Sequence, residues 1–347
     1  MKRILAETMH LKTWNLLTVL LVAGTLATPG SSQQQLQFTT QEGTWMSLDI
    51  SPDGGTLLVE LLGDIYTLPS QGGQATPLLS GWAFQSQARF SPDGRSLAYV
   101  SDETGSDNLW VAKADGSGAR PLTDFEAHVV LSPAWAPDGR SIYATVVFST
   151  GFSSQAEIWR FNLENGEGEQ IVENRNGPSA PLVSSPAPGP YGATPHPDGK
   201  DIYYTSLTPR PYGSRNGPSA TIERVSIDGS EPERVLLESA TAMKPLITTD
   251  GQSLVYATMR EGQAGLKLRD LETGAERWLA WPIQRPQLES KATRDVLPNF
   301  AIDGLGRSVY AAWNGRIRRL GLDSGIEEII PFEAEVSLDI EPRLTFP

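Results

Sequence analysis

Six aspartates recur in this sequence at the same place in a short motif, and a repeated acid could mark a metal or catalytic site. The motif is Ser-Pro-Asp-Gly or a close variant, and its acids are Asp53, Asp93, Asp138, Asp198, Asp250 and Asp303. In such a motif proline presets the first corner of a turn, aspartate binds local backbone amides, and glycine takes a positive φ. We therefore predict that each aspartate shapes a turn, because acids in separate repeats would not converge on one ion.

Histidine and cysteine, which are common in metal sites and as catalytic bases or nucleophiles, are scarce or absent in this sequence. Beyond the N-terminal segment only His128 and His196 remain as histidines, and the chain has no cysteine. Zinc and binuclear sites need several such ligands, and no metalloprotease, nucleophile-elbow or phosphate-loop motif occurs. The sequence thus predicts no catalytic, cofactor-binding or metal-ligating residue in this chain. We interpret His196 as part of a turn and His128 as a structural residue between two repeats.

Two further places could bind a ligand but have simpler interpretations. The acidic stretch Ser101–Trp110, SDETGSDNLW, leaves calcium binding as an alternative. It lacks, however, the ligand spacing of an EF-hand loop. A hairpin loop between two strands accounts for it. Asp49 and Arg89 lie four residues before their turn aspartates in neighbouring repeats, and we expect an ion pair between blades there rather than a binding site.

The elements that carry these turns are short strands. Each repeat has a short strand, the Asp-Gly turn, a β-branched and aromatic strand such as SLAYVS, and two more strands around a second glycine turn. Four strands with hairpin turns make one propeller blade. The predicted repeats lie near residues 45–81, 85–124, 130–174, 190–239, 243–282 and 297–339.

We predict an all-β fold, a β-propeller of about six four-stranded blades. A β-sandwich or a β-solenoid is the alternative fold. The ring would close if the N-terminal strand near LQFTT completed the last blade, and an incomplete or open ring with an exposed edge stays an alternative. Two loops rich in Gly and Pro, Glu173–Pro195 and Thr208–Thr221, interrupt the repeats.

The N-terminus and the overall charge indicate the compartment and exclude one class of partner. Residues 1–27 have a basic start, an apolar run and small residues at its end, as in a signal peptide, which leaves residues 28–347 as the propeller. The apolar run is short for a membrane span. We expect a periplasmic or secreted protein with no stable membrane span after signal removal. The formal net charge of −13 argues against nucleic acid as a partner.

The Ser-Pro-Asp-Gly blades resemble those of TolB-type propellers. Two long stretches, Phe38–Gly81 and Gly265–Asn299, more specifically resemble the N-terminal propeller of a family of exported amidohydrolases, and the resemblance covers nearly all of the chain after the signal. It implies a non-catalytic N-terminal module, or a truncated form, of an enzyme acting on C–N bonds. The partner would be a C-terminal hydrolase domain or another envelope protein. A divalent metal is expected only in that hydrolase domain, whose motifs are missing here. The alternative is a stand-alone TolB-type interaction module of the cell envelope.

Overall fold

The computed structural model describes residues 34–150, 153–175, 187–208, 219–236, 241–288 and 295–340. Contacts divide the chain into two compact units, and the one described below is Gln35–Asp339. The predicted signal peptide lies outside the described residues, as does much of both Gly- and Pro-rich loops.

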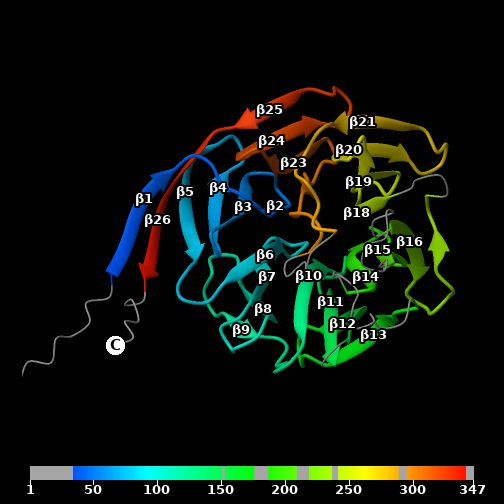
Figure 1. Ribbon diagram of the computed structural model, residues 1–347, viewed down its shortest axis with the longest axis horizontal. Helices are drawn as coiled ribbons and strands as arrows, with labels where there is room; N and C mark the ends of the chain where they lie inside the picture. The colour runs from blue at the N-terminus through cyan, green and yellow to red at the C-terminus, as the bar shows by residue number, and fades with distance from the viewer. Residues whose placement is uncertain are drawn as a thin grey trace, which may run out of the picture. The chain divides into compact units, whose positions relative to one another are not determined.

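Six blades, each an antiparallel sheet of four consecutive strands, surround a central axis (Figure 1). Blade 1 holds β2 (Leu48–Ile50), β3 (Thr56–Leu61), β4 (Asp64–Pro69) and β5 (Gly73–Leu79). Blade 2 holds β6 (Gln85–Phe90), β7 (Ser96–Ser101), β8 (Asn108–Lys113) and β9 (Arg120–Pro121). Blade 3 holds β10 (Val129–Trp135), β11 (Ser141–Thr150), β12 (Ser153–Asn162) and β13 (Gly168–Val172).

The second half of the ring repeats this arrangement. Blade 4 holds β14 (Gly189–Pro195), β15 (Asp201–Thr208), β16 (Ser219–Ser226) and β17 (Glu233–Arg234). Blade 5 holds β18 (Ala242–Ile247), β19 (Ser253–Arg260), β20 (Gln263–Asp270) and β21 (Glu276–Ala280). Blade 6 holds β22 (Ala301–Ile302), β23 (Ser308–Trp313), β24 (Arg316–Gly321) and β25 (Glu327–Ile330). No helix occurs among the described residues, and the predicted all-β propeller of six four-stranded blades is confirmed.

The core consists of apolar clusters at the six blade interfaces. Between blades 1 and 2, for example, Leu58 and Ile65 pack with Leu97 and Tyr99, and all four are buried. The second strand of each blade lies between two neighbouring blades, so both of its faces are covered. This explains why the sequence there is a run of β-branched and aromatic residues rather than a simple alternation. The clusters hold the first strands of the blades around the axis.

The ring closes through blade 1, and the N-terminal strand does not complete the last blade, which was one of the two alternatives left open by the sequence. Blade 6 is complete from its own repeat, while β26 (Phe332–Ile340) pairs in parallel with β5, from Phe332 opposite Gly73 to Ala334 opposite Ala75. The N-terminal strand β1 (Gln34–Thr40) then adds to β26. Blade 1 therefore becomes a sheet of six strands. At the inner side, the Leu48 N–H donates to the Asn299 carbonyl at 2.9 Å and joins blade 6 to blade 1.

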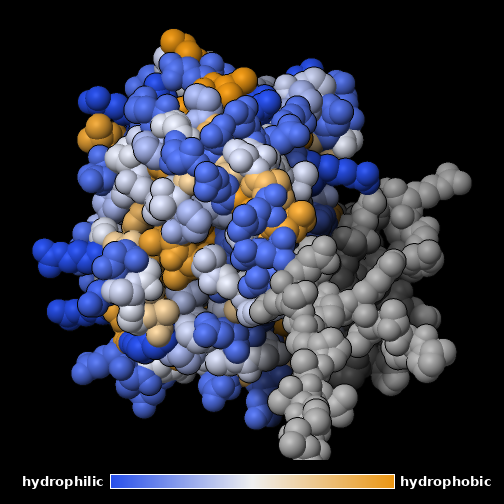
Figure 2. All heavy atoms as spheres, turned by 90° about the vertical axis from the view of Figure 1, so that its left-hand side faces the viewer, coloured by the Kyte–Doolittle hydropathy of each residue, from blue (hydrophilic) through white to orange (hydrophobic). Residues whose placement is uncertain are grey.

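The outer side of blade 1 is the one that faces the viewer in Figure 2, where hydrophilic residues surround scattered apolar ones. A groove of about 660 Å³ lies there between β1, β5 and β26, with Phe38, Pro77 and Val336 among its lining residues.

No helix among the described residues is long and apolar enough to cross a membrane.

Candidate functional site

The turn aspartates bind their own turns, as predicted. At Asp93, Oδ1 accepts hydrogen bonds from the Ser91 hydroxyl at 2.6 Å and from the Arg95 N–H at 3.1 Å. The Ser91 hydroxyl holds the pKa of this exposed carboxyl below its usual range. Gly94 takes a φ of 70°, which explains the glycine of the motif. The same bond to the amide two residues on recurs at Asp53, Asp138, Asp198 and Asp250.

The Asp-Gly turn of blade 6, DGLGRS, is two residues longer than the corresponding DGRS of blades 2 and 3. Asp303 Oδ1 accepts from the N–H of Arg307, four residues on, at 2.8 Å. The aspartate keeps its role although the turn is longer. The recurring acid is therefore a turn residue throughout the ring.

The two histidines lie in structural surroundings. His196 Nδ1 is 2.8 Å from Asp198 Oδ1, and its Nε2 is 3.3 Å from the Gly251 carbonyl of the next blade. His128 packs between Phe125 and Phe148, with ring centroids at 5.5 and 4.6 Å. Both positions agree with the predicted turn and inter-repeat roles.

The acidic stretch from Ser101 forms the connection between β7 and β8. Asn108 is buried there, and its Nδ2 donates to Thr104 Oγ1 and to the Phe125 carbonyl, both at 3.1 Å. Within the described ranges, no group of three or more His, Cys, Asp or Glu side chains is placed to hold a metal ion. That the chain holds no catalytic or metal-ligating residue stays a prediction.

Asp49 and Arg89 form the predicted pair between blades 1 and 2. Arg89 Nη1 lies 3.1 Å from Asp49 Oδ1, and the Phe90 N–H donates to Asp49 Oδ2 at 2.7 Å. Burial raises the pKa of Asp49, while the Arg89 guanidinium opposes that shift. The pair joins two blades, and Arg89 also lines a cavity near the axis.

Four first strands contain a bulge at the same place, and each bulge has a residue with positive φ. These residues are Gln87 (56°), Ser132 (52°), Gly192 (63°) and Lys244 (54°). The register of pairing with the second strand shifts at each of them. A β-bulge leaves one residue unpaired and re-aims its backbone groups. Here it turns an N–H out of the sheet and toward the preceding blade.

A side chain of an earlier blade accepts each of these N–H groups. The four bonds are Gln87 N–H to Glu60 Oε2 (3.0 Å), Ser132 N–H to Gln87 Oε1 (2.7 Å), Gly192 N–H to Thr145 Oγ1 (3.0 Å) and Lys244 N–H to Thr205 Oγ1 (2.8 Å). Glu60, Thr145 and Thr205 occupy equivalent places in β3, β11 and β15. Blade 2 has Val100 at that place, which cannot accept a bond, and the Gln87 side chain supplies the acceptor instead. These bonds fix the first strands relative to one another.

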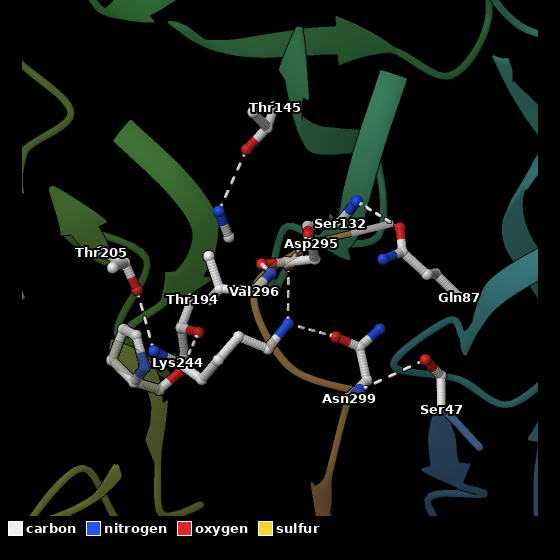
Figure 3. Close-up of polar contacts among 12 residues, drawn as sticks. Ser47, Gln87, Ser132, Thr145, Thr194, Thr205, Lys244, Asp295, Val296 and Asn299 are labelled. Atoms are coloured by element: carbon white, nitrogen blue, oxygen red, sulfur yellow. Dashed lines mark hydrogen bonds and ion pairs between the residues drawn. The ribbon is translucent and has the colours of Figure 1, made fainter. Parts of the chain in front are cut away.

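Four buried polar side chains meet at the axis in what we call the axial cluster: Ser132, Lys244, Asp295 and Asn299 (Figure 3). Lys244 Nζ donates to Asp295 Oδ2 at 2.8 Å and to Asn299 Oδ1 at 2.5 Å. The Ser132 hydroxyl donates to Asp295 Oδ2 as well. Ser132 belongs to blade 3 and Asp295 to the connection into blade 6, so this contact spans the axis between opposite blades.

Residues 295–299 lie buried beside the other members of the axial cluster. Asp295 is fully buried with a φ of 79°, and Val296, Leu297 and Asn299 after it are buried too. Burial lowers the pKa of Lys244, and the Asp295 carboxylate opposes that shift. A buried ammonium and a buried carboxylate are tolerated because each is paired and hydrogen-bonded.

Beside the axial cluster lies a small cavity of about 30 Å³. Its lining includes Arg89, Thr194, Lys244, Asn299 and backbone of the first strands. Asn299 Nδ2 is buried and has no hydrogen-bond partner in the part of the chain that the structure describes. Its Oδ1 faces the ammonium of Lys244, which fixes the orientation of the amide and leaves Nδ2 turned away from that ammonium (Figure 3).

Neither Lys244 nor Asp295 was predicted as a site residue from the sequence. One signal was available for Lys244: it lies six residues before its turn aspartate, where blades 2, 3 and 4 have Gln87, Ser132 and Gly192. A lysine in the first strand of a blade is out of place unless it has a buried partner. Asp295 gives no such signal, because it follows a connection outside the repeated pattern.

Comparison with known proteins links the chain to propellers and peptidases. No family model matches it. A segment of 91 residues is 37% identical to the uncharacterized peptidase YuxL of Bacillus subtilis, covering 26% of this chain and 14% of the relative. A segment of 152 residues is 25% identical to dipeptidyl-peptidase 5 of Porphyromonas gingivalis, covering 41% of this chain and 20% of that peptidase. The chain thus spans a small part of either peptidase.

Two matches extend over more of the molecule. The uncharacterized protein Atu1656 of Agrobacterium fabrum is 25% identical over 216 residues, 60% of this chain and 67% of that protein. The crystal structure of TolB from Acinetobacter baumannii superposes with a TM-score of 0.60 at 17% identity, covering 84% of this chain and 65% of the other. At that identity the likeness concerns the fold. The protein is a TolB-like six-bladed β-propeller with distant homologues among peptidases.

Proposed function

We propose that this chain is a non-catalytic binding propeller of the cell envelope that works beside a hydrolase of C–N bonds. The observation that carries the proposal is how little of the related peptidases this chain matches. The matched segments make up 14% and 20% of two proteins that are named as peptidases. A peptide bond is a C–N bond, so this class agrees with the amidohydrolase resemblance of Phe38–Gly81 and Gly265–Asn299. The hydrolase, with any divalent metal it needs, would be a C-terminal domain or a separate partner.

The N-terminal sequence and the fold both support export of the protein. The pattern of residues 1–27 is that of a signal peptide, and the fold is shared with TolB. We infer a periplasmic or secreted location on these grounds.

Immunodepletion of an envelope fraction tests the proposal. An antibody against the propeller is expected to remove amide- or peptide-hydrolysing activity from the fraction, while a pre-immune serum leaves it. The purified chain, with and without added Zn²⁺ or Mn²⁺, is expected to hydrolyse the same substrates no faster than the blank. Turnover by the purified chain itself, or activity that survives complete depletion, contradicts the proposal.

A stand-alone interaction module is the second candidate. The match to Atu1656 favours it, because that match covers 67% of the relative's own length and so involves a protein of comparable size. An immunoblot of the envelope fraction separates the two. A single band no larger than the 37.6 kDa of this chain, with no hydrolase activity co-depleted, favours the stand-alone module.

A further inference from the structure

The cavity beside the axial cluster has more hydrogen-bond donors than the protein uses. An ammonium has three N–H donors, and Lys244 uses two of them, on Asp295 and Asn299. The Asn299 amide has two more on Nδ2, which has no hydrogen-bond partner among the described residues although Asn299 is only 2% exposed. A buried donor without a partner is unfavourable, so an acceptor that enters the cavity would gain hydrogen bonds there.

Arg89 adds a third donor group to the same cavity. Its Nη1 contacts Asp49 Oδ1 and the Leu48 carbonyl, and a guanidinium has five N–H donors in all. The side chain is 19% exposed, so the guanidinium is partly accessible. Lys244 and Arg89 both line the cavity, and each is paired with a carboxylate of the protein, Asp295 and Asp49 respectively. The lining therefore offers N–H donors without a net positive charge.

The size of the cavity limits what can enter. A volume of about 30 Å³ holds about two water-sized groups. The two oxygens of a carboxylate are each about the size of a water molecule, and both accept charge-assisted hydrogen bonds from lysine and arginine. Two water molecules would also fit the volume and could accept from these donors, but each brings two O–H groups that need acceptors of their own, whereas a carboxylate only accepts.

We propose that this cavity binds a carboxylate through Asn299 Nδ2, Lys244 Nζ and Arg89. The carboxylate can belong to a free small acid or to the C-terminus of a peptide, since both present the same group. The inference goes beyond the proposed function and does not depend on a hydrolase, because it stands on the donors of this cavity alone.

Thermal unfolding and titration calorimetry of the full chain test the site with matched probes. The probes are acetate, acetamide, N-acetyl-dialanine with a free C-terminus and the same dipeptide as its C-terminal amide, at constant ionic strength set with NaCl. A carboxylate is expected to raise Tm by about 2–4 °C at roughly ten times its Kd, and its neutral amide is not. Binding of acetate at least as tight as that of the dipeptide acid identifies a free small acid. Tighter binding of the dipeptide acid identifies a peptide terminus.

Asn299→Asp is the informative variant. It keeps an oxygen for Lys244 and replaces the free donor by an anionic oxygen, so it is expected to fold and to bind carboxylates at least tenfold more weakly. Asn314→Gly is the matched control in the same blade, because Asn314 has a φ of 51° that glycine accepts easily. It is expected to bind as the wild type does.

Three results would overturn the proposal. They are equal binding of acid and amide probes, no effect of any carboxylate beyond that of NaCl, and unchanged carboxylate affinity in Asn299→Asp. The first two come from the wild-type protein alone, so they hold even if the variant folds poorly.

Discussion

Asp93 and Asp295 present the same side chain in opposite surroundings. Asp93 is exposed at the edge of blade 2, and its partners Ser91 and Arg95 lie two residues away on either side. Asp295 is fully buried at the axis, and its partners Ser132 and Lys244 lie 163 and 51 residues away in sequence. The first carboxylate repeats in every blade, whereas the second occurs once.

The turn acids therefore stabilise individual blades, whereas the axial acid connects different blades to one another. A turn acid is satisfied by its own hairpin, so its replacement disturbs one turn. An axial acid joins elements from three blades, so its replacement disturbs the point where they meet. The axial cluster should therefore dominate stability although the turn acids are more numerous.

The largest effect is expected from Lys244→Met. The substitution keeps much of the apolar stem but leaves Asp295 buried without its cation, which costs about 3–5 kcal/mol. Chemical denaturation measures the loss. Lys267→Met is the control, since Lys267 pairs with Glu276 at 2.9 Å near the surface, and such pairs contribute below about 1 kcal/mol.

A double variant tests whether the unpaired charge of Asp295 causes the loss of stability in Lys244→Met. In Lys244→Met combined with Asp295→Asn both charges are absent, and asparagine tolerates the φ of 79° at that position. The double variant should regain part of the lost stability. If Lys244→Met is no worse than Lys267→Met, the axial pair is not what holds the centre together.

An intermediate effect is expected from Thr205→Val. Thr205 is fully buried and accepts the Lys244 N–H at 2.8 Å, so valine of similar shape leaves a buried donor unsatisfied at a cost of about 1–3 kcal/mol. Thr145→Val removes the equivalent bond to Gly192 and should cost a similar amount. Thr67→Val, which loses only an exposed contact of 3.4 Å to the Thr76 carbonyl, should change the free energy of unfolding little. Equal losses for all three would show that the bulge bonds have no special weight.

The blades were predictable from sequence because their information is local. Each Ser-Pro-Asp-Gly turn contains its own donors and its own positive-φ glycine, and the strand after it is recognisable by its β-branched and aromatic residues. The Asp49–Arg89 pair was predictable as well, since both residues occupy the same place in adjacent repeats.

The closure and the axial cluster depend on contacts that no repeat contains. The strand near LQFTT was recognised, but whether it joins blade 6 or β26 on blade 1 depends on which edge is free after folding. Asp295 lies in a connection between blades, and nothing near it in sequence indicates Lys244 or Ser132 as partners.

The smallest effect is expected at the turn acids, and it should depend on pH. The Ser91 hydroxyl holds the pKa of Asp93 below its usual value. A carboxyl with a depressed folded-state pKa binds fewer protons in the folded than in the unfolded protein. Its contribution is therefore present above the unfolded pKa of about 4 and is lost as pH falls through the folded pKa. Asparagine at Asp93 can still form the turn but does not titrate.

Thermal melts of the wild type and Asp93→Asn between pH 7 and pH 2.5 measure this difference. The wild type should be slightly more stable at pH 7, and the gap in Tm should close below about pH 4. Asp250→Asn should behave alike, because Asp250 has the equivalent bonds to Thr248 and Gln252 and a pKa lowered by the Thr248 hydroxyl. A gap that stays constant with pH would mean that turn shape rather than charge sets the effect. A gap as large as the loss in Lys244→Met would contradict the ranking of axis over edge, because an exposed acid with partners two residues away would then matter as much as a buried one that joins three blades.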